Sequence, residues 1–261
     1  MRLDVNGIAA FAATGGREPA PGLPTVVFIH GAGLDHSVWA AQSRWFAHHG
    51  RNVLAVDLPG HGHSAGPPLP TIAGMADWIA AFLTVLNIQQ AALVGHSMGT
   101  LVALAAAQRH PDRVRALGLV GAALAIPVHP DLLAAAEANR HEAIDMVSLW
   151  GHGFAAGLGG NLAPGLWMTG AAERVLERAA PGVLFNDLSA CNAWTDGPAA
   201  AASVRCPTVI LQGSRDVMTP LRAARALAAA IPGAKLTVLD EAGHMLLAER
   251  PDAVLAALAT L

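Results

Sequence analysis

The sequence predicts an α/β protein with a mostly parallel, doubly wound β-sheet and an inserted helical segment. Short strand-like runs of aliphatic and β-branched residues alternate with longer helix-like segments, an alternation typical of parallel sheets with helices on both faces. Several of these runs end directly in polar or glycine-rich turns. Open α/β sheets build their functional sites at such strand ends.

The predicted elements begin with a hairpin. Asn6-Gly7 separates strand-like residues 3–5 and 8–11, and Asn-Gly is the strongest two-residue hairpin signal because both positions need positive φ. The Gly- and Pro-rich residues 15–24 predict a loop. The elements expected next are strand 26–29, helix 37–48, strand 53–56, helix 72–86, strand 92–94, a helix ending near residue 110 and strand 116–120.

Ser97 is the strongest candidate for a catalytic nucleophile. It is the centre of Gly95-His96-Ser97-Met98-Gly99, which matches G-x-S-x-G, follows an apolar run and precedes an Ala-rich segment. In this context the motif places a serine on a sharp, strained turn with its Oγ exposed above the sheet. The flanking glycines avoid the crowding that a Cβ would cause. A small-residue turn with a surface serine would give the same pentapeptide, so the remaining residues decide between the two.

Two further polar residues follow later strands in the order that such a nucleophile requires, first an acid and then a histidine. Asp216 comes after strand-like residues 208–211, and His244 comes after strand-like residues 235–239. The sequence therefore predicts a Ser97–His244–Asp216 triad at the carboxyl ends of parallel strands.

Backbone amides for an oxyanion hole are predicted at two turns. The amide of Met98, directly after the serine, is one expected donor. The other is expected in His30-Gly31-Ala32-Gly33, which follows a β-branched run and whose small residues allow close approach to a substrate oxygen. We assign this second donor to Ala32, with Gly33 as the alternative.

These motifs resemble the α/β-hydrolase fold family over essentially the whole chain. The matching segments, in the family's order, are residues 30–33 with Trp39, residues 57–64, residues 95–99, residues 213–216 with Pro220, and Gly243-His244. The resemblance implies Ser97 as nucleophile, His244 as base and Asp216 as its partner, with no metal and no organic cofactor. It does not name a substrate, because the family's substrate range is wide.

Residues 122–204 interrupt the strand–helix alternation, at the point where this family usually carries a helical cap. We expect a cap there, on a core formed by residues 1–121 and 205–261, with helices over residues 131–149 and 170–179. Large apolar side chains in this segment predict an apolar substrate channel. The residues expected to contact substrate are Gly33, Leu34, Trp150, Phe154, Trp167, Val217 and Met245, and the candidates for polar contacts are Asn161, Asn186 and Asn192.

Histidines in the other motifs are expected to have no required chemical role. We interpret His30 and His61 as loop-holding residues, and His63 and His96 as residues that could border the site. These histidines lie on separate loops without the spacing typical of metal ligands. We therefore expect no metal site.

Composition limits the compartment and the partners. With 53% hydrophobic and 13% charged residues, the chain can bury one sizeable core. The net charge of −3 indicates no nucleic-acid partner, and no apolar run is long enough to span a bilayer. The first residues lack a signal-peptide pattern, and Cys191 and Cys206 are interpreted as buried free thiols. We expect a cytoplasmic protein, either a monomer or a homodimer.

The predicted chemistry is hydrolysis of a small-molecule carboxylic ester with an apolar acyl or alcohol part. His244 would take the proton of Ser97, whose Oγ attacks the carbonyl carbon, and water would then hydrolyse the acyl-enzyme. Activity is expected to fall in acid as His244 becomes protonated.

Other functions stay open at this point. The same triad could cleave lactones or the carbon–carbon bonds of ring-fission dienoates. Carbon–carbon hydrolases of this family usually carry basic groups for the substrate carboxylates, and Arg140 and His141 are poor candidates for that role. A receptor-like binding module with vestigial hydrolysis is an alternative of another class. Epoxide hydrolases and haloalkane dehalogenases are disfavoured, because those relatives use Asp where this chain has Ser97.

Overall fold

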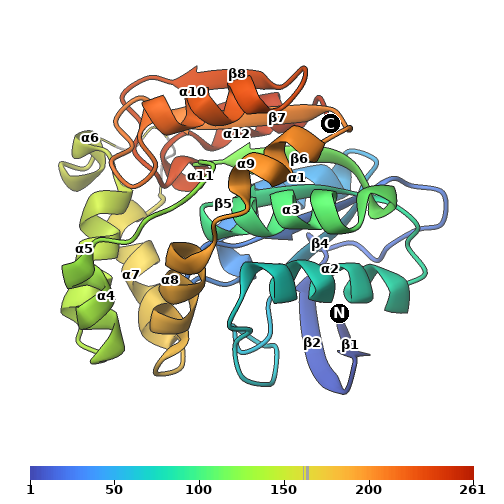
Figure 1. Cartoon of the computed structure of the whole chain (residues 1–261), viewed down its shortest axis with the longest axis horizontal. Coiled ribbons are helices and arrows are strands. Elements are labelled where there is room, and N and C mark those ends of the chain that lie inside the picture. Colours follow the sequence, from blue (N-terminus) through green and yellow to red (C-terminus); the bar gives the residue numbers. More distant parts are fainter. Residues whose placement is uncertain (161, 163–164) are drawn as a thin grey trace.

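A computed structural model of the chain describes residues 1–160, 162 and 165–261, and within them eight strands form one sheet (Figure 1). The order across the sheet is β1-β2-β4-β3-β5-β6-β7-β8; the pairs β1–β2 and β2–β4 are antiparallel and the others are parallel. The strands are β1 (Arg2–Val5), β2 (Ile8–Ala13), β3 (Thr25–Ile29), β4 (Asn52–Asp57), β5 (Ala91–His96), β6 (Val114–Val120), β7 (Thr208–Gly213) and β8 (Lys235–Leu239).

The antiparallel edge of the sheet is the hairpin that the Asn-Gly pair predicts. Asn6 and Gly7 have φ angles of 55° and 84°, and Val5 pairs with Ile8, as a two-residue turn with positive φ at both positions requires. β2 then continues past the hairpin and pairs with β4, which joins the hairpin to the parallel part of the sheet.

Helices cover both faces of the sheet. Val27 and Ile29 of β3 enter one hydrophobic core, which α2 and α3 complete, while Val26 and Phe28 enter a second core with α1 and α12. This alternation follows from the two-residue period of a strand, and it confirms the doubly wound arrangement. The helices that come before β6 or after β7 in the chain are η1 (His36–Trp39), α1 (Ala40–His48), α2 (Ile72–Val85), α3 (Met98–Arg109), η2 (Pro111–Arg113), α10 (Leu221–Ala230), α11 (Leu246–Glu249) and α12 (Pro251–Leu258).

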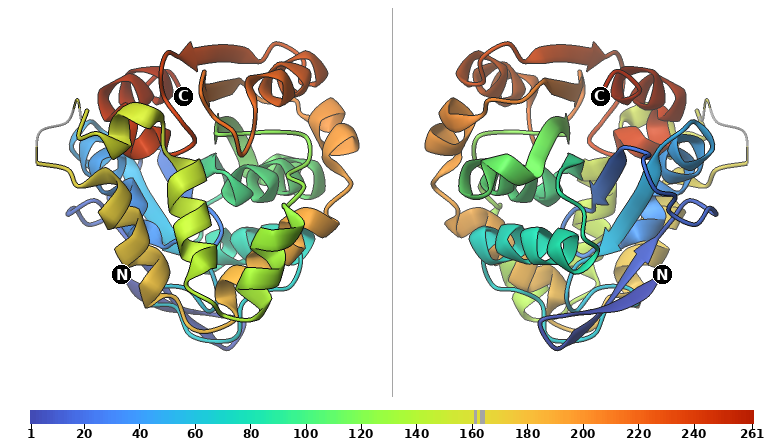
Figure 2. Two further views of the ribbon diagram at one scale, coloured as in Figure 1. Left: turned by 90° about the vertical axis from the view of Figure 1, so that its left-hand side faces the viewer. Right: turned by 90° about the vertical axis from the view of Figure 1, so that its right-hand side faces the viewer.

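The chain between β6 and β7 is helical in its described part. Figures 1 and 2 show α4, α5, α7 and α8 grouped at one side of the sheet, whereas α9 contacts α3 and α10. The helices are α4 (Pro130–Glu137), α5 (Glu142–Gly151), α6 (Phe154–Gly157), α7 (Met168–Arg178), α8 (Val183–Ala193) and α9 (Gly197–Ser203). No helix in the described ranges combines the length and apolarity needed to cross a bilayer.

Two details of this segment differ from the sequence prediction. The single helix expected over residues 131–149 is two helices, because Asn139 adopts a left-handed conformation with φ 49° and ends the first. Helices α6, α8 and α9 were not expected; in α8 the buried Asp187 interrupts the apolar stripe that would have marked the helix. The expectation of two buried thiols is correct for Cys191, but Cys206 is only partly buried.

Candidate active site

Ser97 lies at a strained turn between β5 and α3. Its φ of 53° and ψ of −118° fall in a region that residues with a side chain rarely adopt. A Cβ at Gly95 would overlap the backbone of Gly99, and a Cβ at Gly99 would overlap the carbonyl of Ile29. The Ser97 amide donates to the Val120 carbonyl of β6 at 3.0 Å. Close backbone packing therefore holds the turn in this conformation.

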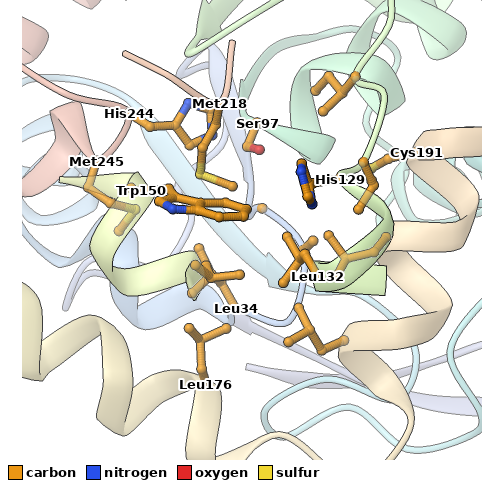
Figure 3. A pocket seen from close by; sticks show the side chains of 18 of the residues that line it. Leu34, Ser97, His129, Leu132, Trp150, Leu176, Cys191, Met218, His244 and Met245 are labelled. Atoms are coloured by element: carbon orange, nitrogen blue, oxygen red, sulfur yellow. The ribbon is translucent and has the colours of Figure 1, made fainter. Parts of the chain in front are cut away.

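His244 and Asp216 come together at the ends of β8 and β7. The distance from His244 Nδ1 to Asp216 Oδ2 is 2.7 Å, and both side chains are buried. Because a carboxylate accepts, Nδ1 carries the proton and Nε2 of the neutral ring is an acceptor. This Nε2 is buried and has no hydrogen-bond partner among the described residues. Figure 3 shows His244 and Ser97 on the same pocket.

The Asp216 carboxylate is held by four donors besides His244. Oδ1 accepts from the amides of Met218 (2.9 Å) and Thr219 (2.8 Å), and Oδ2 accepts from Thr219 Oγ1 and Gln212 Nε2, both at 2.7 Å. Burial works to raise the pKa of this carboxyl, but the His244 ring and the Thr219 hydrogen bonds outweigh it and lower the pKa. Asp216 is therefore ionised at neutral pH. Sequence reasoning missed Gln212 and Thr219, and their only signal was their place beside the Asp216 turn.

The turn after β3 offers one free amide near Ser97. Ala32 lines the pocket with Ser97, and its amide has no acceptor among the described residues. The Gly33 amide instead donates to Asp187 Oδ2 at 2.9 Å, which removes the alternative donor. Met98 is the first residue of α3, a position whose amide has no acceptor within the helix.

A buried ion pair connects α8 to this turn. His61 Nε2 lies 2.8 Å from Asp187 Oδ2, and His61 Nδ1 lies 3.0 Å from the Pro59 carbonyl. Both oxygens can only accept, so both ring nitrogens must donate and the ring is an imidazolium. Burial works to lower the pKa of His61, but the charge and hydrogen bond of Asp187 outweigh it and raise the pKa. Asp187 thus binds the Gly33 turn and the His61 loop together.

Two neighbouring histidines are neutral. His30 Nε2 accepts from the Leu58 amide at 3.2 Å and Nδ1 donates to the Gly31 carbonyl at 2.9 Å; burial and the charge of His61 lower its pKa to about 4. His96 Nε2 donates to the His244 carbonyl at 3.0 Å, and burial lowers its pKa to about 3. As expected, His30 and His61 hold loops.

The loop that carries His244 is bonded to the end of α5. The His244 amide donates to the Gly151 carbonyl at 2.9 Å. The buried Glu249 carboxylate accepts from the amides of Gly153 and Gly243 at 3.0 Å. The position of the catalytic candidate His244 therefore depends on the helical segment as well as on the sheet.

An apolar cavity of about 530 Å³ opens beside Ser97 and His244 (Figure 3). Leu34, Trp150, Val217 and Met245 line it, as expected from the sequence. Among the described lining residues, no side chain is Lys, Arg, Asp or Glu. Lining side chains that sequence reasoning missed include His129, Leu132, Leu176, Leu184, Cys191 and Met218. For Leu132, Leu176, Leu184 and Cys191 the only signal was the apolar stripe of the helix that carries each of them.

Three expected substrate contacts are corrected by the structure. Phe154, at the start of the short helix α6, and Trp167, just before α7, are 84% and 66% exposed and do not line this cavity, because the backbone directs both side chains to solvent. Gly33 lines a separate, smaller cavity beside Asp35 and Arg178, since its amide turns toward α8.

The asparagines expected to make polar contacts with substrate have structural partners where the structure describes them. Asn186 Nδ2 donates to the Leu69 carbonyl at 2.9 Å, and Asn192 Oδ1 accepts from the Val128 amide at 3.1 Å. Asn161 lies outside the described residues. The described asparagines thus fasten loops rather than face the cavity.

One group of described side chains, Asp35, His36 and Asp57, has its potential ligand atoms close enough together for a metal ion. Asp57 already accepts from the His36 ring and the His63 amide, and Asp35 pairs with Arg178 at 2.8 Å. The carboxylates of the cluster therefore already have hydrogen-bond or ion-pair partners, and these contacts give the cluster a structural role.

Comparison with known proteins identifies the family. A family model described as the α/β-hydrolase fold matches residues 24–251. The chain belongs to this family. A solved family member with a similar fold is the enol-lactonase from Burkholderia xenovorans LB400, with a TM-score of 0.88 and 26% identity over 100% of this chain and 98% of that one.

Curated relatives of this α/β-hydrolase are named as hydrolases of different bonds; two are named as methyl ester esterases and others as putative carbamate hydrolases. A pimeloyl-[acyl-carrier protein] methyl ester esterase of Aromatoleum aromaticum is 32% identical over 245 residues, 88% of this chain and 94% of the relative. A protein of the same name from Chromobacterium violaceum is 35% identical over 230 residues, 85% and 87% of the two chains. Family and relatives together support hydrolase activity.

Proposed function

We propose that this α/β-hydrolase is a serine carboxylesterase whose substrate has an apolar acyl or alcohol part. One observation carries the proposal: Ser97, on its strained turn, lines the same apolar cavity as His244, whose Nε2 has no described partner and whose Nδ1 is bonded to the buried Asp216. An ionised Asp216 that fixes the tautomer of a histidine on the same cavity as a serine is the arrangement that serine hydrolysis requires.

The mechanism follows from these positions. His244 Nε2 takes the proton of Ser97 Oγ, which forms a bond to the carbonyl carbon. The Ala32 and Met98 amides stabilise the oxyanion, an interaction that is typically worth roughly 2.7–4 kcal/mol per donor. His244 then gives the proton to the departing alcohol. Water repeats the same steps on the acyl-enzyme and releases the carboxylic acid and free Ser97.

The cavity supports an uncharged substrate. No Lys or Arg side chain stands among its described residues to pair with a carboxylate, and burying an unpaired charge is strongly unfavourable. The two candidates for such a role lie outside it: Arg140 is 3.8 Å from Glu142, and His141 is 3.0 Å from Glu177. This disfavours dienoates, and the esterase names of the curated relatives favour an ester.

We further propose that residues 122–204 act as a cap that is fixed to the site rather than free to open widely. Support comes from the Asp187 bonds to Gly33 and His61 and from the bond of the Gly151 carbonyl to His244. These contacts join the segment to both turns that the mechanism uses.

The test is hydrolysis of p-nitrophenyl esters from acetate to decanoate. Ser97→Ala should abolish turnover, while Ser203→Ala, at a serine of α9 that bonds only within its own helix, should keep it. The chain-length optimum reports the size of the cavity. Turnover that survives in Ser97→Ala would refute the serine mechanism. Absence of ester turnover by folded wild type, with hydrolysis of lactones, would move the proposal to lactonase activity, and a single round of acylation would favour a binding role.

A further inference from the structure

His129 places a polar group in the apolar wall of the cavity, away from the candidate catalytic residues Ser97 and His244. It lies at the start of α4, its side chain is 57% exposed, and it lines the cavity with Ser97. Figure 3 shows its ring on the opposite side of the pocket from His244 and Met218. The proposed mechanism gives it no role.

Its local contacts fix which ring nitrogen faces a ligand. The Asp131 amide donates to His129 Nδ1 at 3.3 Å, so His129 acts as the N-cap of α4 through its side chain. Nδ1 therefore holds a lone pair, and the neutral ring carries its proton on Nε2. Nε2–H is a donor without a protein acceptor among the described residues.

A second contact restricts the ring's orientation. His129 packs edge-on against Trp150, with ring centroids 5.7 Å apart and an interplanar angle of 68°. The cap bond and this aromatic contact leave little rotational freedom, so a hydrogen bond from Nε2–H to a ligand requires little further ordering. The indole nitrogen of Trp150 points toward the Met245 side in Figure 3, so it does not duplicate this donor.

We propose that His129 is a specificity-determining residue that donates its Nε2–H to a second oxygen of the substrate, away from the scissile carbonyl. The substrate class is then an uncharged ester whose apolar body carries one further acceptor, such as an ether, ketone or second ester oxygen. This inference rests on the proposed esterase function and narrows it. An acceptor at the correct position gains a hydrogen bond to His129, and a plain hydrocarbon chain offers none.

The experiment is an oxygen scan of the acyl chain. The kcat/KM values of p-nitrophenyl octanoate and its 4-, 5-, 6- and 7-oxa analogues are measured for wild type, three variants of His129 and one control variant. In wild type one position should be preferred over octanoate, and the same preference should be roughly five- to tenfold smaller in His129→Leu. For each protein the kcat/KM of an oxa analogue is divided by that of octanoate. Differences in intrinsic ester reactivity cancel when this ratio is compared between wild type and a variant.

Two matched variants separate recognition from helix capping. His129→Asn keeps a good N-cap acceptor but is too short to replace Nε2–H, so it should lose the preference as His129→Leu does. His129→Gln places an amide N–H near the Nε2 position and should keep much of the preference. His141→Leu, at an exposed histidine outside the cavity, should match wild type.

The outcomes are distinct. Identical oxygen preferences in wild type, His129→Leu and His129→Asn, with Ser97-dependent hydrolysis intact, would overturn this inference alone. An equal loss on every ester in all three His129 variants would show a purely structural role and also overturn it. Absence of Ser97-dependent hydrolysis would overturn both this inference and the proposed function.

Discussion

Replacing Asp187 with Asn tests the charge state assigned to the buried pair between α8 and the core. The amide can still accept from Gly33, but it carries no charge to balance the His61 imidazolium. If His61 becomes neutral instead, one of its ring nitrogens loses its proton. The lone pair of that nitrogen then faces an oxygen, either the Pro59 carbonyl or the new amide oxygen, with no hydrogen between them. Breaking a buried ion pair in this way costs about 3–5 kcal/mol. For a chain of this size that corresponds to a fall in Tm of roughly 6–20 °C.

The loss should depend on pH in a defined direction. The folded pKa of His61 is raised, so the pair's contribution is fully present below the unfolded value of about 6.5 and is lost as pH rises through the folded value. The difference in unfolding free energy between wild type and Asp187→Asn should therefore be larger near pH 6 than near pH 9. The pKa of His36 is also raised, through Asp57, but this contribution is common to both proteins and cancels.

Urea unfolding at the two pH values measures both effects. Asp145→Asn is the matched control, because Asp145 is an exposed aspartate of the neighbouring helix α5 that pairs with His141 at the surface. It should change the unfolding free energy by less than about 1 kcal/mol. A loss of the same small size for Asp187→Asn, or a loss that does not change with pH, would refute the reasoning.

Three further predictions concern the site. Asp216→Asn should lower kcat by about 10³- to 10⁴-fold with little change in KM, because the His244 tautomer is no longer fixed. Steady-state kinetics measures the change, with circular dichroism as the check of folding, and a loss of kcat under tenfold would contradict the prediction. Gly99→Ala should give an inactive or unstable protein, because its Cβ overlaps a backbone carbonyl of β3, whereas Gly157→Ala, with no atom nearby, should behave as wild type in a thermal melt. Leu176→Trp should shift the preferred acyl-chain length of the ester substrate to shorter chains, because the larger side chain fills the cavity. Leu158→Trp, at an exposed position, should leave the preferred length unchanged. The same preferred length in both variants would argue that the acyl chain does not reach Leu176.

The fold of the core was predictable because its signals are local and repeated. Val26 to Ile29 form a β-branched and aromatic run of strand length, and Asn6-Gly7 specifies its turn through φ alone. The site's chain order was predictable for a related reason: parallel strands bring their carboxyl ends to one edge, so residues that follow those strands meet there. The roles of Ser97, Asp216 and His244 themselves stay predictions until the variants are measured.

The helical segment was less predictable, because the positions of its residues depend on contacts with residues that are distant in the sequence. Asp187 sits on the buried face of α8 and interrupts the apolar stripe that would have marked the helix. Phe154 and Trp167 have the composition of pocket residues, yet the chain turns them to solvent. Hydrophobicity indicates that a side chain can be buried, but only the path of the backbone decides where.

By itself the sequence determined the sheet, the hairpin, the strained serine turn and the order of the candidate catalytic residues, since each depends on neighbouring residues or on strand ends. Only the tertiary structure decided which histidines are charged, which amide near Ser97 is free and which side chains line the cavity. His61 and Asp187 are 126 residues apart, and the charge of one is set by the oxygen of the other. Contacts of that kind have no local pattern, because they form only when packing removes water and leaves each polar atom one available partner.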